Sequence, residues 1–416
     1  MSTLIGVTGP YLYIGSLRAE KIAEEFGTPV YVYDAELVEE NYLRLRRSFR
    51  YGNLEVMYAC KANNSVEILK HLRDLGAGLD AVSPWEVALG VRVGFRREKI
   101  LFTGTSVTVE EMKFVRGELG VLVNVDSIPQ LRRYGKTFPE TEVSVRINPG
   151  IGAGHHEYAV TGGVTKFGIY INQLDKVEEV LREYRLRLVG LHAHIGSGIL
   201  RPEPFVETAE RLLKVAQLFR DLEFVDIGGG FGIPYRPGER PLDLDYLGSR
   251  LSSLFEEFSS KYGSVKLRVE PGRFIVGSAG VLLVRVVDIK EVEVGGTRKV
   301  FVGVDSGMNH LIRPALYGAY HEVVAVSKAD RPRVLTADVV GNVCESGDVL
   351  AVNAQLPELE EGDVLAIMNA GAYGYSMSSN YNMRPRPPEV VVRGASAKLT
   401  RRREVLEDLL RVFVEL

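Results

Sequence analysis

Several side chains suited to cofactor chemistry stand directly after short apolar runs of this sequence. Lys61 follows the run at 54–59, and Glu270 and Arg273 close the run at 265–270. A desolvated lysine has a lowered pKa, and its free amine can form a Schiff base with a carbonyl group. A glutamate can hold a protonated ring nitrogen, and an arginine can bind a carboxylate or phosphate through paired hydrogen bonds. A solvated lysine and a surface salt bridge are the plainer interpretations of the same residues.

Three consecutive glycines, Gly228, Gly229 and Gly230, follow the apolar run at 223–227. Residues without a Cβ let backbone N–H groups close round an anion, so the triplet predicts a phosphate site, with a tight turn as the alternative. The segment does not match the G-x-G-x-x-G pattern, because Ile233 stands where the third glycine should be. A Rossmann dinucleotide site is therefore disfavoured.

His192 and His194 are two positions apart on a predicted strand and therefore share one face. They could form a metal-binding pair, one ring could stack on a planar cofactor, or at least one could be a satisfied core histidine. The remaining histidines show no ligand spacing, which disfavours the metal. A lysine, a phosphate loop, a carboxylate and a stacked ring together indicate pyridoxal phosphate.

Eight apolar runs separated by helical stretches must position these residues. Near-continuous apolar runs are typical of parallel strands covered on both faces, and eight such units predict a (β/α)₈ barrel. Active sites of such barrels lie at the C-terminal ends of the strands, where the lysine, histidines, glycines and Glu270 would converge. The runs are 54–59, 77–82, 99–103, 120–125, 142–147, 188–195, 223–227 and 265–270.

After residue 271 the sequence becomes β-rich, with glycine and proline turns, and predicts a second, mostly antiparallel β domain. The first 30 residues do not fit the barrel pattern. We therefore expect a cofactor-binding barrel over 31–273. Residues 1–30 with 274–416 would form a β-rich domain for substrate specificity and dimerisation.

The composition excludes several classes of protein. The 416 residues are 45% hydrophobic and 25% charged, as in a globular protein of two or three domains. The net charge of −3 without a basic stripe argues against nucleic acid as a partner. The sequence has no apolar stretch of about 18 residues, so we expect no membrane span, and its start does not resemble a secretion signal. Cys60 and Cys344 predict free thiols in a reducing cytoplasm.

Nearly the whole chain resembles the barrel-fold pyridoxal-phosphate decarboxylases of amino acids. The segment CESGD is the most specific part of the resemblance, because relatives that act on ornithine and arginine carry a different specificity element. It points to the branch of the family that acts on diaminopimelate. The matching segments are TPVYVYD (28–34), YACKAN (58–63), KFG (166–168), HIGS (194–197), DIGGG (226–230), EPGR (270–273), RPALY (313–317), CESGD (344–348) and AGAY (370–373).

The resemblance implies a set of roles around pyridoxal 5'-phosphate. Lys61 would form the Schiff base with the cofactor, His194 would stack on its pyridine ring, and Glu270 would face the ring nitrogen. Tyr373 would touch both cofactor and substrate. The residues around the phosphate end would be Ser197, Gly228, Gly229, Gly230, Gly272 and Arg273.

The resemblance also implies roles at the substrate end. Arg313 and Tyr317 would hold a carboxylate that Arg273 could also reach, and Glu345 would bind the distal ammonium group. Cys344 would be the acid that returns a proton to the α-carbon. In the family the Cys-Glu pair comes from the neighbouring subunit, so we expect a homodimer whose active site is shared across the interface.

The activity implied by the resemblance is decarboxylation of meso-2,6-diaminopimelate to L-lysine, the last step of lysine biosynthesis. Decarboxylation of ornithine, arginine or lysine, and racemisation of an amino acid on the same fold, are the alternatives. One departure from the family pattern is Pro84-Trp85, where small glycines are usual, and we expect Trp85 to pack under a helix start. The glycine-rich loop 150–158 is a candidate lid, in which the roles of His155 and His156 stay open.

Overall fold

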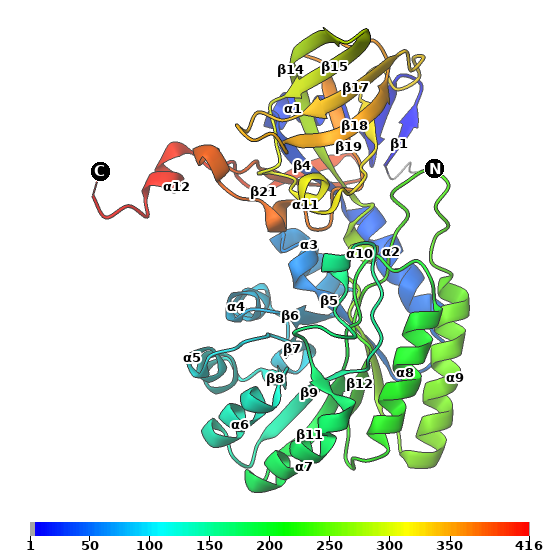
Figure 1. Ribbon diagram of the computed structural model, residues 1–416, viewed down its shortest axis with the longest axis vertical. Helices are drawn as coiled ribbons and strands as arrows, with labels where there is room; N and C mark the ends of the chain where they lie inside the picture. The colour runs from blue at the N-terminus through cyan, green and yellow to red at the C-terminus, as the bar shows by residue number, and fades with distance from the viewer. Residues whose placement is uncertain (1–4, 416) are drawn as a thin grey trace.

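The structure is a computed structural model that describes residues 5–415. Eight parallel strands close into a barrel, because β13 pairs back with β5 and β8 pairs with β9 (Figure 1). This confirms the predicted (β/α)₈ barrel. The strands are β5 (Leu54–Ala59), β6 (Gly78–Ala81), β7 (Ile100–Phe102), β8 (Leu122–Val125), β9 (Glu142–Asn148), β11 (Arg187–His192), β12 (Phe224–Asp226) and β13 (Lys266–Val269).

Helices surround the barrel and bury the outer faces of its strands, so that every residue of β6, β7 and β12 is buried. Burial on both faces explains why these strands appear in the sequence as continuous apolar runs. The outer helices are α2 (Ala35–Ser48), α3 (Val66–Asp74), α4 (Pro84–Val93), α5 (Val109–Met112), α6 (Ile128–Thr137), α7 (Leu174–Glu183), α8 (Glu203–Ala216) and α9 (Leu244–Tyr262).

Short elements fill the connections of the barrel. The π-helical turn η3 extends α5, and β10 pairs with the end of β9 outside the closed barrel. These elements are η1 (Cys60–Ala62), η2 (Arg97–Lys99), η3 (Lys113–Glu118), η4 (Glu157–Ala159), β10 (Ile169–Tyr170) and η5 (Ile171–Gln173).

A second sheet lies over one end of the barrel (Figure 1), and the hydrogen bond from Tyr373 to Ala62 shows that this end carries η1. Its pairs are antiparallel except for β15–β17 and β20–β4, as the β-rich pattern after residue 271 predicts. Its strands are β14 (Gly280–Val294), β15 (Thr297–Val304), β16 (Val323–Ala325), β17 (Leu335–Val340), β18 (Val349–Leu356), β19 (Val364–Ile367), β20 (Glu389–Arg393) and β21 (Ser396–Arg401).

The start of the chain packs on this second sheet. Strand β4 lies between β14 and β20, although residues 31–34 fall inside the range expected for the barrel. Leu12, Ile14 and Ile22 share an apolar core with Val281 and Leu283. The elements are β1 (Ile5–Thr8), β2 (Tyr11–Ile14), β3 (Leu17–Arg18), α1 (Ala19–Phe26) and β4 (Val30–Asp34).

Hydrogen bonds join the second sheet to the barrel mouth. The backbone N–H of Tyr373 donates to the carbonyl of Ala62 at 2.8 Å, and Asn63 Nδ2 donates to the carbonyl of Gly371 at 2.9 Å. No helix in the part of the chain described is long and apolar enough to cross a membrane. The remaining elements are α10 (Arg273–Val276), α11 (Arg313–Tyr317), η6 (Tyr375–Met377), η7 (Tyr381–Met383) and α12 (Leu406–Leu410).

Candidate active site at the barrel mouth

Lys61 lies in η1, directly after β5, at the mouth of the barrel. Its Nζ is 3.0 Å from Oδ2 of Asp80, a fully buried carboxylate at the end of β6. Burial acts to lower the pKa of Lys61, but Asp80, Tyr373 and Glu270 outweigh it and the pKa is raised. The sequence predicts a pKa lowered by desolvation, and the neighbouring groups reverse the direction of that shift. A proton must leave Lys61 before its amine can bond to a carbonyl carbon.

A buried acidic cluster lies at the ends of β11, β12 and β13. His192 Nε2 is 3.1 Å from Glu270 Oε2. Asp226 lies beside both residues: a ring nitrogen of His192 and one carboxylate oxygen each of Asp226 and Glu270 lie within 4.8 Å of one another. Burial, reinforced by the charge of Asp80, raises the pKa of Glu270 to about 8. The other carboxyl oxygen of Glu270, Oε1, is buried and has no partner among the described residues. Glu270 thus offers an unpaired oxygen and a proton to a ligand in the mouth.

His194 does not form a pair with His192. Its Nδ1 accepts a hydrogen bond from the backbone N–H of Gly229 at 3.0 Å, so the neutral ring carries its hydrogen on Nε2. Burial and the charge of Lys61 keep the pKa of His194 well below its usual range. The ring is therefore neutral and fixed in orientation, as a side chain stacked on a planar group must be.

Two of the three backbone N–H groups of the glycine triplet bind other residues of the protein, whereas the sequence predicts that they face an anion. The N–H of Gly228 donates to Asp226 Oδ1, and that of Gly229 donates to His194. Only the N–H of Gly230 has no partner in the described chain. A Cβ on Gly228 would lie 2.2 Å from the carbonyl oxygen of Ala193, so this glycine is needed for packing. The triplet positions the histidine and the aspartate as well as facing the mouth.

Two buried arginines lie next to this loop. Arg273 is 5% exposed and Arg313, at the start of α11, is 1% exposed. Neither forms an ion pair with a carboxylate anywhere in residues 5–415, and the Nε of each lacks a partner there. Arg273 donates from Nη2 to Ser197 Oγ at 3.0 Å. Since buried charges are normally paired, the arginines indicate a site for an anionic ligand.

Tyrosine and histidine side chains surround the two arginines. Arg273 Nη1 donates to Tyr235 Oη at 2.9 Å, and the Arg273 guanidinium lies 4.8 Å from the ring centroid of Tyr373. Tyr317 is one helical turn after Arg313, and its ring is 5.9 Å from that of His155. A cavity of about 160 Å³ opens here, lined by His155, Tyr235, Arg313 and Tyr317 among others.

Gly272 lies where the loop before α10 approaches η1. A Cβ at this position would be 2.7 Å from the Cβ of Ala62 and 3.1 Å from that of Ala59. The glycine therefore lets the chain carrying Glu270 and Arg273 lie against the turn that carries Lys61.

The Cys-Glu segment lies apart from this cluster in the single chain. Cys344 and Glu345 are exposed at the tip of a loop between β17 and β18, and no hydrogen bond or ion pair of the described residues joins them to the mouth. The loop is nevertheless ordered by Asp348, which is 4% exposed and accepts N–H groups of Met308 at 2.5 Å and Val343 at 2.7 Å. Both predicted residues are thus presented outward.

The expected packing of Trp85 under a helix start was wrong. Trp85 is 75% exposed at the start of α4 and contacts the ring of Phe114, with centroids 6.0 Å apart. The helix start is closed instead by Ser83 Oγ, which accepts the N–H of Glu86, and by Glu86, which accepts the N–H of Val82. Trp85 therefore does not perturb the contact between Asp80 and Lys61.

Sequence reasoning gave Asp80, Tyr235 and His321 no role in the site. Asp80 sits inside an apolar strand, and Tyr235 follows the glycine loop by only a few residues. His321 has no ligand spacing, so only its contact with Arg313 reveals it. The signal available for Asp80 was a carboxylate near the C-terminal end of a barrel strand, and that for Tyr235 was its place in the loop that follows β12.

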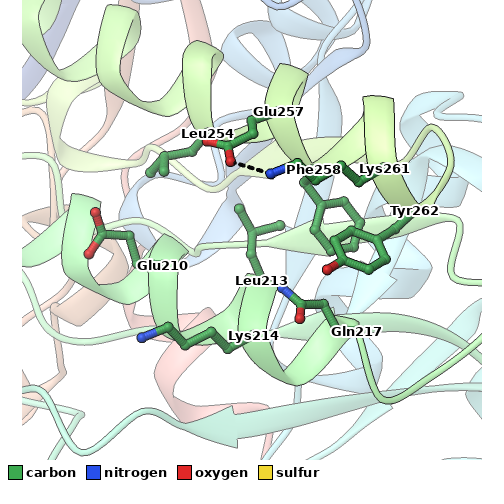
Figure 2. A pocket seen from close by; sticks show the side chains of 9 residues that line it. All are labelled: Glu210, Leu213, Lys214, Gln217, Leu254, Glu257, Phe258, Lys261 and Tyr262. Carbon is green, nitrogen blue, oxygen red and sulfur yellow. Dashed lines mark hydrogen bonds and ion pairs between the residues drawn. The ribbon is translucent and has the colours of Figure 1, made fainter.

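A groove on the outside of the barrel is separate from the mouth (Figure 2). It has a volume of about 300 Å³ and lies between α8 and α9. Apolar side chains such as Leu213 and Phe258 line it, and its charged pair, Glu257 and Lys261, is joined at 2.7 Å. This groove contains none of the predicted site residues.

The mouth fits the pyridoxal phosphate expected from the sequence. The unpartnered Oε1 of Glu270 suits a protonated ring nitrogen, and the neutral ring of His194 suits a stacked plane. Lys61 is 30% exposed at its side chain and so remains accessible from the mouth. Ser197 and Arg273 supply donors for an anion.

Comparisons with known proteins agree with this geometry. Residues 35–277 match the family described as pyridoxal-dependent decarboxylase, pyridoxal binding domain. A diaminopimelate decarboxylase of Methanothermobacter thermautotrophicus is 47% identical over 96% of this chain and 95% of its own. One of Aquifex aeolicus is 37% identical over 94% of this chain and 93% of its own.

A solved structure shares the whole arrangement. The diaminopimelate decarboxylase of M. jannaschii, in co-complex with L-lysine, superposes with a TM-score of 0.90 at 32% identity. It covers 100% of this chain, and this chain covers 98% of it. The chain therefore belongs to the pyridoxal-dependent decarboxylases and, within them, to the family of the diaminopimelate decarboxylases.

Proposed function

We propose that this chain releases carbon dioxide from meso-2,6-diaminopimelate and leaves L-lysine, with pyridoxal 5'-phosphate bound at the barrel mouth. The observation that carries the proposal is the pair of buried guanidinium groups, Arg273 and Arg313, that have no carboxylate partner within residues 5–415. Two such charges call for anions from a ligand. The cofactor phosphate and the substrate carboxylates are anions of the required kind.

The residues at the C-terminal ends of the barrel strands would hold the cofactor. Bound there, pyridoxal phosphate supplies an electron sink for the pair left on the substrate α-carbon. Lys61 would anchor it covalently, and Glu270 Oε1 would share a proton with the ring nitrogen. His194 would cover one face of the ring, and Ser197 with the N–H of Gly230 would face the phosphate.

A second group of residues, most of them from the second domain, would orient the substrate. Arg313 and Tyr317 would bind the carboxylate that is retained, and Arg273 reaches the same region. The bond from the α-carbon to the other carboxylate breaks, and its electron pair stays on the α-carbon. Cys344 Sγ then delivers a proton to that carbon, so the products are carbon dioxide and L-lysine.

The position of Cys344 supports a shared active site. Cys344 and Glu345 are exposed on an ordered loop and do not reach the mouth of their own chain. A homodimer in which each loop enters the site of the other subunit would bring the thiol and the distal carboxylate to the substrate.

The free thiols of Cys60 and Cys344 also support a cytoplasmic location for the enzyme.

The substrate preference has a physical reason. In the proposed shared site, a substrate without a distal ammonium and carboxylate would leave Glu345 of the entering loop and the two buried arginines without partners. Sites built to pair such groups discriminate strongly, by roughly 10⁴-fold or more. Ornithine, arginine and lysine each lack the second carboxylate.

The experiment that tests the proposal is a substrate panel with the purified protein and added cofactor. Release of carbon dioxide is measured with diaminopimelate, ornithine, arginine and lysine in turn. We expect turnover of diaminopimelate alone and formation of L-lysine. Faster turnover of any other substrate would contradict the assignment, as would solvent deuterium entering the substrate without gas release, which indicates a racemase.

A further inference from the structure

Tyr235 connects the two unpaired arginines of the mouth. Its hydroxyl accepts from Arg273 Nη1 at 2.9 Å. Its ring centroid is 5.7 Å from the guanidinium carbon of Arg273 and 4.7 Å from that of Arg313. A phenol ring offers a negative π face to cations and a lone pair at its oxygen. The side chain therefore contacts both positive charges at once.

His321 fixes Arg313 from the other direction. Its Nε2 is 2.9 Å from Arg313 Nη1, and its Nδ1 is 2.8 Å from the carbonyl of Met368. A carbonyl can only accept, so Nδ1 carries the hydrogen and Nε2 accepts from the arginine. His321 is 2% exposed, and its ring lies edge-on to Tyr235 with centroids 5.5 Å apart.

The electrostatics of this array match its geometry. Burial acts to raise the pKa of Tyr235, but the positive charges of Arg273 and Arg313 outweigh it and the pKa is lowered. Burial, together with the charge of Arg313, lowers the pKa of His321 to about 3, so the ring is neutral at any working pH. Tyr235 thus offsets the repulsion between two like charges, and the neutral ring of His321 supplies a lone pair to Arg313.

We propose that Tyr235 and His321 are positioning residues that hold the guanidinium groups of Arg273 and Arg313 ready for one carboxylate at the far end of the substrate. They set the preference for ligands that carry this carboxylate. The inference rests on the proposed function, because the carboxylate is the one that decarboxylation leaves on L-lysine. Neither residue takes part in the bond-breaking step.

The test compares two ligands that differ only in the carboxylate. L-lysine retains it, whereas pentane-1,5-diamine has the same chain and both amines without it. Inhibition constants for both ligands, and KM and kcat for diaminopimelate, are measured on the holoenzyme. The variants are Tyr235→Phe, His321→Ala and His321→Gln, and the control is Tyr262→Phe on the outer groove (Figure 2).

We expect Tyr235→Phe to weaken L-lysine binding and raise KM by about 3- to 10-fold, the effect of one lost hydrogen bond, with kcat nearly unchanged. The inhibition constant of pentane-1,5-diamine should not move. His321→Ala should act in the same selective way, and His321→Gln less, because an amide oxygen can still accept from Arg313. Tyr262→Phe should behave as wild type.

Several results would overturn the inference. Equal weakening of both ligands in Tyr235→Phe and His321→Ala would show a general structural effect, and unchanged L-lysine binding in both would show no role. A fall in kcat with KM constant would place the residues in the chemical step instead. Should Tyr235→Phe fail to fold, the two His321 variants decide by the same comparison. Wild-type protein that releases no carbon dioxide would overturn the proposed function itself, and this inference with it.

Discussion

At the scale of single residues, the mouth brings together Lys61, His194 and Glu270, which follow three different strands of the barrel, β5, β11 and β13. Lys61, His194 and Glu270 could be predicted together because the C-terminal ends of parallel barrel strands meet at one mouth. The raised pKa of Lys61 could not be predicted, since it depends on Asp80 of the neighbouring strand. Contacts between segments distant in the sequence, such as that of Tyr235 with Arg313, leave no local pattern.

Glu270 makes the stability of the cofactor-free protein depend on pH. Its pKa is raised from 4.5 to about 8, mainly by burial, so the folded chain keeps a proton that the unfolded chain has released. This contribution to stability is complete below the unfolded pKa and is lost as the pH rises through the folded pKa. We expect the free energy of unfolding of the wild type, relative to Glu270→Gln, to fall between about pH 5 and about pH 8. Urea unfolding at several pH values measures it, and an unchanged difference would contradict the assignment.

Cys344 carries a prediction that separates binding from proton transfer. Cys344→Ala should leave the cofactor bound, because the proposed cofactor site consists of barrel residues such as Lys61, His194 and Glu270 and does not include the thiol. Turnover of diaminopimelate should fall by about 10²- to 10⁴-fold if the thiol is the proton donor. Steady-state rates and the visible absorption spectrum are measured together. A wild-type rate would show that the proton comes from another group.

At the scale of elements, the apolar runs of the sequence predicted every barrel strand, because a strand that is buried on both faces consists of consecutive apolar residues. Thr108 and Glu111 have the spacing of a capping box, and their reciprocal hydrogen bonds start α5. The sequence did not show to which sheet β4 belongs. Its five residues are all buried like those of a barrel strand, yet they pair with β14 and β20 of the other sheet. Pairing partners are set by tertiary contacts, so an apolar run alone does not assign a strand to a sheet.

The loop that carries Cys344 depends on Asp348. Asp348 accepts two backbone N–H groups, and an asparagine would direct its NH₂ group at one of these donors. We expect Asp348→Asn to lower the free energy of unfolding by about 1–3 kcal/mol. Turnover should fall with it, since the tip of the loop loses its fixed shape. Glu358→Gln, a substitution outside the loop, is the control. Full stability and activity in Asp348→Asn would show that the loop is held by other contacts.

At the scale of the whole molecule, the proposed mechanism requires two subunits for one complete site. The sequence could indicate this only through the family resemblance, because an interface leaves no periodic signal. The single chain agrees with the requirement in one respect: its mouth holds Lys61 and the arginines, whereas Cys344 and Glu345 face outward.

Mixed dimers test the shared site. Lys61→Ala and Cys344→Ala should each be nearly inactive alone. After the two are mixed and allowed to exchange subunits, half the dimers contain one intact site, so activity should recover to about a quarter of the wild-type value. Decarboxylation is measured before and after exchange, with each variant incubated alone as the control. No recovery after verified exchange would place both residues in the same chain's site.

We propose that the cofactor is bound covalently to Lys61 and that diaminopimelate reacts there. The most direct test of this proposal is borohydride reduction of the holoenzyme, followed by digestion and mass spectrometry of the peptides. We expect that the peptide containing Lys61 alone carries the reduced cofactor and that diaminopimelate, added before the borohydride, protects it. Labelling of another lysine, or labelling of Lys61 that diaminopimelate does not affect, would contradict it.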